Sequence, residues 1–148
     1  MINILYSSIT GNNKDIAQSF ADSLSNIGVK YNIYDIYNID PSIINQTDIL
    51  ILVIYTYDEG TIPDESIELY EEIKNSQLSG MFYQLIGSGD IMYGKENFNA
   101  ALDKFDEVLN LSNAKKISDT LKVNLMMDER AYKKILEISE KLAKNYVF

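Results

Sequence analysis

Short polar side chains gather in one segment, between an apolar N-terminal stretch and an amphipathic helical pattern. The segment reads Ser7-Ser8-Ile9-Thr10-Gly11-Asn12-Asn13. Hydroxyl groups and the unpaired backbone N–H groups of a helix N-terminus can donate hydrogen bonds to an anion, and the helix dipole favours negative charge there. The segment therefore predicts an anion site, while an ordinary helix cap would use the same residue types. The glycine spacing and lysine of a triphosphate-binding loop are absent, as is a dinucleotide fingerprint, so a terminal monophosphate is favoured.

The composition excludes much of ordinary side-chain catalysis. The chain has no cysteine and no histidine, which removes thiolate nucleophiles, His-based triads and the usual zinc ligands. We therefore expect no metal site and no catalytic residues, and any redox chemistry would need a cofactor. A formal charge of -9 and a single arginine, Arg130, argue against a nucleic-acid partner.

The elements that must position these residues alternate between strands and helices. Periodicity predicts strands over 2–6, 30–36, 48–55, 81–87 and 117–124. It predicts helices over 12–27, 64–75 and 96–110, and a last helix that Asp128 caps. The first helix would direct Ile16, Phe20, Leu24 and Ile27 inward, and one helical turn is expected after Pro41 in the connection 37–47.

This alternation favours a single α/β domain over residues 1–148, with a doubly wound five-stranded parallel sheet and helices on both faces. Right-handed crossovers place the carboxyl ends of all strands on one edge of such a sheet, where ligands bind. The loops after the first, third and fourth strands are therefore the candidate site.

The residues of these loops resemble those of the flavodoxins. Ser8, Thr10, Gly11 and Asn12 match the phosphate loop of that family, in which Asn13 here replaces a threonine. The loop after the third strand resembles the first flavin-covering loop, with Asp58 at a usual glycine; its residues are Thr56, Tyr57, Asp58, Glu59 and Gly60. The loop after the fourth strand resembles the second such loop through Ser88, Gly89, Asp90 and Tyr93. Taken singly, a Gly-x-Gly is also typical of a plain turn, and Tyr57 is one of eleven tyrosines.

The resemblance covers the whole chain and implies non-covalently bound FMN, a strand order of 2-1-3-4-5 and the function of a low-potential one-electron carrier rather than an enzyme. In that case residues 7–13 would hold the phosphate, Tyr57 and Tyr93 would cover the two faces of the ring, and the backbone of Ser88 to Asp90 would line the pyrimidine edge. Two alternatives share the cofactor: a flavodoxin-like activator of ribonucleotide reductase and a flavin-dependent quinone reductase.

Partners are expected to be a flavodoxin reductase and acceptor proteins with basic docking surfaces. Seven acidic residues near the second loop would attract them; these are Asp58, Glu59, Asp64, Glu65, Glu68, Glu71 and Glu72. No targeting or membrane segment is apparent, so we expect a cytoplasmic monomer that binds neither membrane nor nucleic acid.

Overall fold

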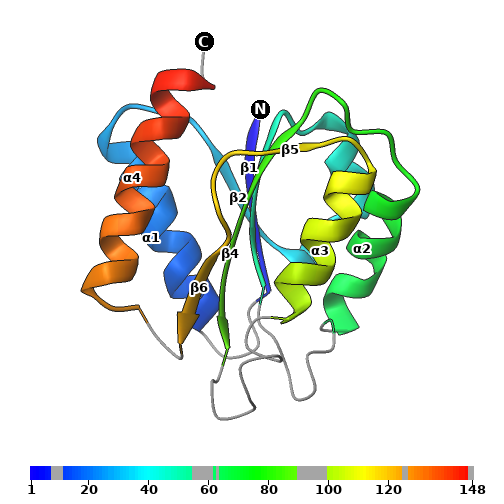
Figure 1. Ribbon diagram of the computed structural model, residues 1–148, viewed down its shortest axis with the longest axis horizontal. Helices are drawn as coiled ribbons and strands as arrows, with labels where there is room; N and C mark the ends of the chain where they lie inside the picture. Colours follow the sequence, from blue (N-terminus) through cyan, green and yellow to red (C-terminus); the bar gives the residue numbers. More distant parts are fainter. Residues whose placement is uncertain (8–11, 55–61, 63, 90–99, 125–126, 147–148) are drawn as a thin grey trace.

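A central parallel sheet with helices on both faces forms the protein (Figure 1). The computed structural model describes residues 1–7, 12–54, 62, 64–89, 100–124 and 127–146. The strands are β1 (Ile2–Tyr6), β2 (Asn32–Asp35), β3 (Ile49–Val53), β4 (Phe82–Gly89), β5 (Lys115–Lys116) and β6 (Leu121–Asn124). The α-helices are α1 (Asn12–Asn26), α2 (Ile67–Lys74), α3 (Ala100–Leu111) and α4 (Glu129–Asn145), and the short 3-10 helices are η1 (Ile36–Asn38), η2 (Pro41–Gln46) and η4 (Asp64–Ser66).

The strand order is β2-β1-β3-β4-β5, and β6 pairs with the far end of β4. Every pairing between these strands is parallel, which confirms the doubly wound sheet that the sequence predicts. At the centre Ile4 lies opposite Ile51, and Ile51 lies opposite Gln84. All five residues of β3 are buried, as expected of a strand covered on both faces.

The edge strand differs from its prediction. The sequence predicts one strand over 117–124, but only the second half of this range is a strand, β6, and the two-residue β5 precedes the range. Strand β5 pairs with Phe82 and Tyr83, whereas β6 pairs with Ile86 to Gly89. The side chain of Gln84, which is fully buried, fills the gap between the two pairings. Its Nε2 donates to the backbone oxygen of Asp119 at 2.9 Å, and its Oε1 accepts from the backbone N–H of Ser118 at 3.1 Å. Between β5 and β6, hydrogen bonds of the Gln84 side-chain amide thus take the place of backbone hydrogen bonds to β4.

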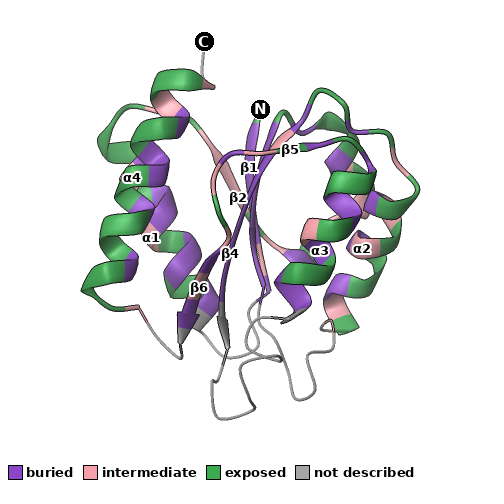
Figure 2. Cartoon of the chain, viewed as in Figure 1, coloured by how far each residue is buried: buried purple, intermediate pink, exposed green. Residues whose placement is uncertain are grey.

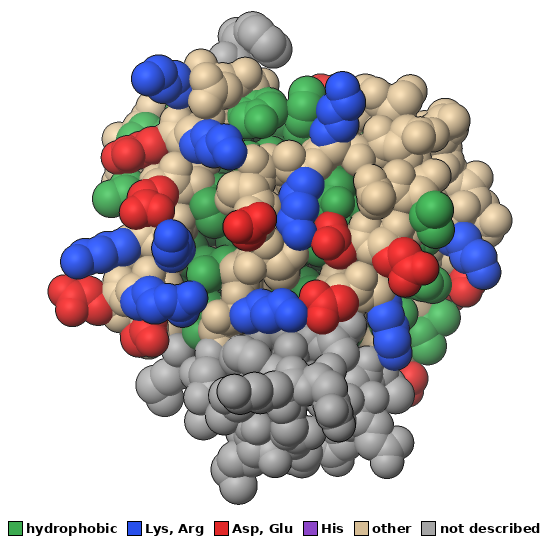
Figure 3. Space-filling model, viewed as in Figure 1, with side chains coloured by type: hydrophobic (Ala, Val, Ile, Leu, Met, Phe, Trp, Pro, Cys, Tyr) green, Lys and Arg blue, Asp and Glu red, His purple; other side chains and the backbone are tan. Residues whose placement is uncertain are grey.

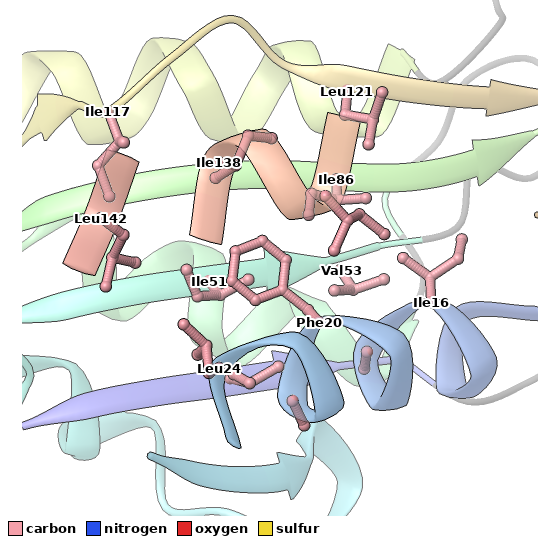
Figure 4. Packing of buried hydrophobic residues seen from close by; sticks show 14 of the residues in the cluster. Ile16, Phe20, Leu24, Ile51, Val53, Ile86, Ile117, Leu121, Ile138 and Leu142 are labelled. Carbon is pink, nitrogen blue, oxygen red and sulfur yellow. The ribbon is translucent and has the colours of Figure 1, made fainter. Parts of the chain in front are cut away.

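Helices α1 and α4 cover one face of the sheet, and α2 and α3 cover the other, with their buried sides turned toward the strands (Figure 2). On the first face Phe20 of α1 lies among Ile51 of β3 and Ile138 and Leu142 of α4 (Figure 4). On the second face Tyr70 of α2 meets Phe105 of α3 edge-on, with ring centroids 5.5 Å apart. Two hydrophobic cores therefore fix the sheet between its helical layers.

The predicted helices are confirmed with small differences. Helix α1 buries Ile16, Phe20 and Leu24, but Ile27 is 38% exposed, so its inward assignment is wrong. The reason is that α1 ends at Asn26, and Gly28 then adopts φ +78, which turns the chain away. A helical turn follows Pro41 as expected. The expected start of the third helix at residues 96–99 lies outside the described residues.

The last helix begins as its cap predicts. The Asp128 side chain accepts a hydrogen bond from the backbone N–H of Ala131 at 2.8 Å. In the described part of the chain no helix is long and apolar enough to span a bilayer.

Candidate functional site

The carboxyl ends of β1, β3 and β4 lie side by side at one edge of the sheet. The register places Tyr6 opposite Val53 and Val53 opposite Ile86. Beyond these pairs, the backbone N–H of Ser7 donates to Val53 O at 3.0 Å, and that of Ile54 donates to Ile86 O at 3.1 Å. The starts of the three loops singled out by sequence are thus held together by backbone hydrogen bonds.

Helix α1 brings its N-terminus to the same edge. It begins at Asn12, with only four residues between it and Ser7, and runs back across the sheet (Figure 1). Its first turn has backbone N–H groups without partners inside the helix and the positive end of the helix dipole. Asn13, in this turn, is fully buried. The edge therefore offers hydrogen-bond donors and a favourable potential to an anion.

The end of β4 is held by β6. Ser88 lies opposite Val123 and Gly89 lies opposite Asn124 in a parallel ladder. Because β6 pairs further along β4 than β5 does, the ladder reaches Gly89, six residues beyond the last pairing of β5 at Tyr83. The backbone of Ser88 and Gly89 is consequently fixed beside the ends of β1 and β3.

Ser7 also forms a side-chain hydrogen bond with Glu65. The Ser7 hydroxyl donates to Glu65 Oε1 across 58 positions of sequence, and Ser7 is 1% exposed. The other carboxylate oxygen, Glu65 Oε2, is buried and has no hydrogen-bond partner among the described residues. This contact joins the end of β1 to η4, immediately before α2.

Five of the residues predicted to bind the cofactor lie in the described part of the chain. Of these, the structure brings together Ser7, the α1 start at Asn12 and Asn13, and the β4 end at Ser88 and Gly89. The remaining predicted residues lie outside the described residues; they are Ser8, Ile9, Thr10, Gly11, Thr56, Tyr57, Asp58, Glu59, Gly60, Asp90 and Tyr93. Glu65 was predicted only as a member of an acidic surface cluster, and no local signal reveals its contact with Ser7.

Charge is distributed unevenly around this edge. Residues 1–75 contain twelve acidic and three basic residues, whereas residues 76–148 contain ten of each. The acidic excess includes η4 and α2, where Asp64 and Glu68 line a recess of about 220 Å³ beside the exposed Tyr37. The face built by α3, β6 and α4 instead carries both signs interspersed (Figure 3). Ion pairs such as Lys122–Asp103, at 3.1 Å, contribute to that balance.

These features define a class: a doubly wound α/β protein with a helix N-terminus beside three strand ends at the switch point of its sheet. The chain belongs to the flavodoxin family, since the family model described as "Flavodoxin" matches residues 4–138. It is 33% identical over 122 residues to a probable flavodoxin 1 of Bacillus subtilis, covering 82% of this chain and 76% of that protein. It is 32% identical over 117 residues to the sulfite reductase [NADPH] flavoprotein alpha-component of a Shewanella species, covering 77% of this chain but 19% of that protein.

Solved structures agree with the family assignment. A short-chain flavodoxin associated with a bacterial microcompartment superposes with a TM-score of 0.90 at 33% identity, over 97% of this chain and 96% of that one. A Fusobacterium nucleatum flavodoxin bound to flavin mononucleotide shares the fold, with a TM-score of 0.78 at 16% identity, over 97% of this chain and 96% of that one. Flavodoxins are electron-transfer flavoproteins that bind FMN.

The described residues fit this cofactor. A phosphate dianion needs donors and positive potential, and the edge supplies the N-terminus of α1 with no acidic side chain between residues 7 and 13. The donor set is uncharged, which suits a single terminal phosphate better than a chain of phosphates, since the latter calls for lysine or arginine.

Proposed function

We propose that this protein is a low-potential one-electron carrier that holds FMN without a covalent bond and moves electrons between a reductase and acceptor proteins. Bound FMN supplies the redox chemistry, and the chain binds, orients and partly covers it. The observation that carries this proposal is the meeting of the α1 N-terminus with the ends of β1 and β4 in a chain of the flavodoxin family.

We assign the phosphate to the segment 8–13, whose hydroxyl, amide and backbone N–H groups would donate to it. The two flavin-covering loops would then hold the ring. In this assignment Thr56 to Gly60 lie toward one face and Ser88 to Asp90 line the pyrimidine edge, while Tyr57 and Tyr93 stack on opposite faces. The roles come from the family resemblance of these residues, and the arrangement leaves one flavin edge for partners.

The acidic side of the molecule is proposed to receive those partners. Asp64, Glu68 and Glu71 lie on η4 and α2, next to the carboxyl edge of the sheet, and among the described residues no lysine or arginine lines the recess there. A basic protein surface would be steered toward this side. Flavodoxin reductase and basic acceptor enzymes are the expected partners.

The absorption spectrum of the purified protein tests the cofactor. It should be yellow, with about one FMN per chain, because the family and the site both call for this flavin. Protein that is colourless and stays colourless after incubation with FMN would contradict the proposal.

A turnover assay separates a carrier from an enzyme. Mixed with a nicotinamide cofactor and a quinone, the protein alone should show negligible turnover, since the single Arg130 leaves no basic clamp for a nicotinamide phosphate. Adding a flavodoxin reductase should let electrons reach a one-electron acceptor. Fast oxidation of the nicotinamide without the reductase would instead indicate a quinone reductase.

A further inference from the structure

Glu65 occupies an unexpected place for an acidic residue, within hydrogen-bond distance of the segment that precedes an anion site. Its Oε1 accepts the hydroxyl hydrogen of Ser7, the residue between β1 and the phosphate segment. A hydroxyl group has one hydrogen to donate. With that hydrogen directed to Glu65, the Ser7 hydroxyl has none to donate to a phosphate, so a different role for Ser7 is needed.

The role of Ser7 follows from its hydrogen bonds, which fix both its backbone and its side chain. Its backbone N–H donates to Val53 of β3, its hydroxyl donates to Glu65 of η4, and its side chain is buried. Only residues 8–11 separate it from Asn12, which is fixed by the helix α1. The chain leaves the sheet at Ser7, so the placement of Ser7 constrains the geometry of the donors that follow it in sequence.

The contact with Ser7 satisfies only one of the two carboxylate oxygens of Glu65. One of its carboxylate oxygens is buried without a hydrogen-bond partner among the described residues, and an incompletely satisfied buried carboxylate lowers stability. We therefore expect the contact to affect the position of Ser7 rather than the free energy of unfolding.

We propose that Glu65 is a positioning residue for phosphate recognition: by accepting the Ser7 hydroxyl hydrogen, it sets the exit of the chain from β1 and thereby the anion-binding geometry of the segment up to α1. This inference rests on the proposed FMN function and adds to it a residue outside the binding loops. It assigns to Glu65 an effect on the phosphate of the ligand and none on its ring.

The test compares FMN with riboflavin, which lacks the phosphate. Titrations of apoprotein by fluorescence quenching should show that Glu65→Ala lowers the affinity for FMN about tenfold and changes that for riboflavin less than about twofold. Ser7→Ala should have the same effect, and the double variant should be no worse than either, because one hydrogen bond is lost in all three. Glu65→Gln should keep the preference for FMN, since its amide oxygen can still accept.

Inorganic phosphate provides a second readout that does not involve flavin. It should raise the melting temperature of wild-type apoprotein and of Glu65→Gln more than that of Glu65→Ala or Ser7→Ala. Glu107→Ala is the control, because it removes an exposed glutamate of α3 far along the chain from β1.

The outcomes separate the inference from the function on which it rests. If wild-type protein binds FMN and riboflavin equally, the phosphate site itself is overturned. If wild type prefers FMN but Glu65→Ala loses affinity for both ligands equally, or for neither, Glu65 does not position the phosphate segment. A wild-type preference that Glu65→Gln keeps and both alanine variants lose supports the proposal.

Discussion

The carboxamide of Gln84 on β4 accepts two hydrogen bonds from Ser118, and these fix the connection between β5 and β6 through a side chain. Gln84 Oε1 accepts from the backbone N–H of Ser118 at 3.1 Å and from its hydroxyl at 3.0 Å. Gln84 Nε2 donates to the backbone oxygen of Asp119. The position of β6, and with it the support for the end of β4, depends on this buried amide.

Replacing Gln84 by leucine should therefore lower the stability of the whole domain. The change keeps the volume but leaves the Ser118 N–H and the Asp119 carbonyl without their partner, so we expect a loss of about 2–4 kcal/mol in the free energy of unfolding. Denaturant titration of the apoprotein measures it. Gln46→Leu, at the exposed end of η2, should change stability by less than about 0.5 kcal/mol. Equal losses of stability in the two variants would mean that the hydrogen bonds of the Gln84 amide do not stabilise the domain.

A second prediction concerns alkaline pH. Burial of Tyr83, its hydrogen bond to Asp106 at 2.6 Å and the charge of Asp106 raise the pKa of the phenol well above its ordinary value of 10.0. The unfolded chain therefore releases the Tyr83 proton at lower pH than the folded chain, so stability is full below pH 10 and falls as the pH rises above it. The slope from this group approaches about 1.4 kcal/mol per pH unit.

Denaturant titrations between about pH 9 and pH 11.5 check this prediction. Tyr83→Phe should show a shallower decline with pH than wild type. Tyr132→Phe, which removes the hydroxyl of a tyrosine 54% exposed on α4, should decline like wild type. Parallel curves for all three proteins would contradict a raised pKa for Tyr83.

The proposed stacking of Tyr93 on the flavin gives a third prediction. Tyr93→Ala should weaken FMN binding about tenfold or more and restore flavin fluorescence, because aromatic contacts add roughly 0.5–1.5 kcal/mol beyond the loss of buried area. Tyr37 is the suitable control, since it is 65% exposed on η1. If Tyr37→Ala weakens FMN binding as much, Tyr93 is not a stacking residue.

The acidic side gives a fourth prediction. Neutralising Asp64, Glu68 and Glu71 to amides should slow electron transfer from a basic reductase about tenfold at low ionic strength, and the difference should shrink in high salt. Stopped-flow rates at two ionic strengths measure it. The matched control neutralises Glu129, Glu137 and Glu140 on α4, on the face of balanced charge, and should change the rates little. Similar losses in both variants would mean that only total charge matters.

Local patterns were sufficient for most of the fold because the inward faces repeat at the periods of their elements. The buried run of β3, the stripe of α4 and the Asp128 cap all appear in the sequence as they do in the structure. Ile27 was misplaced because its spacing continues the helical stripe, whereas the helix ends one residue before it, at Asn26, and Gly28 then turns the chain.

Contacts that depend on a distant partner could not be read from local patterns. The interruption of the edge strand arises from Gln84, which lies 34 positions before Ser118 and has the sequence context of any buried strand residue. Likewise Glu65 carries the same acidic signal as its neighbours Asp64 and Glu68, and only the packing of η4 against the end of β1 distinguishes it. That the ends of β1, β3 and β4 meet was predictable, because parallel topology alone brings them to one edge of the sheet.

The interrupted edge strand also affects how copies of this protein meet one another. A continuous edge strand presents a row of free N–H and C=O groups on which a second sheet can assemble. Here the edge consists of two residues in β5 and four in β6, and between them the Ile117 carbonyl is occupied by Lys141 Nζ at 2.7 Å. Charged side chains also lie along it: Lys115 is exposed, and Lys116 and Lys122 form ion pairs with Asp106 and Asp103 of α3. The interruption at Gln84 thus leaves too short a template for edge-to-edge aggregation along this side of the sheet.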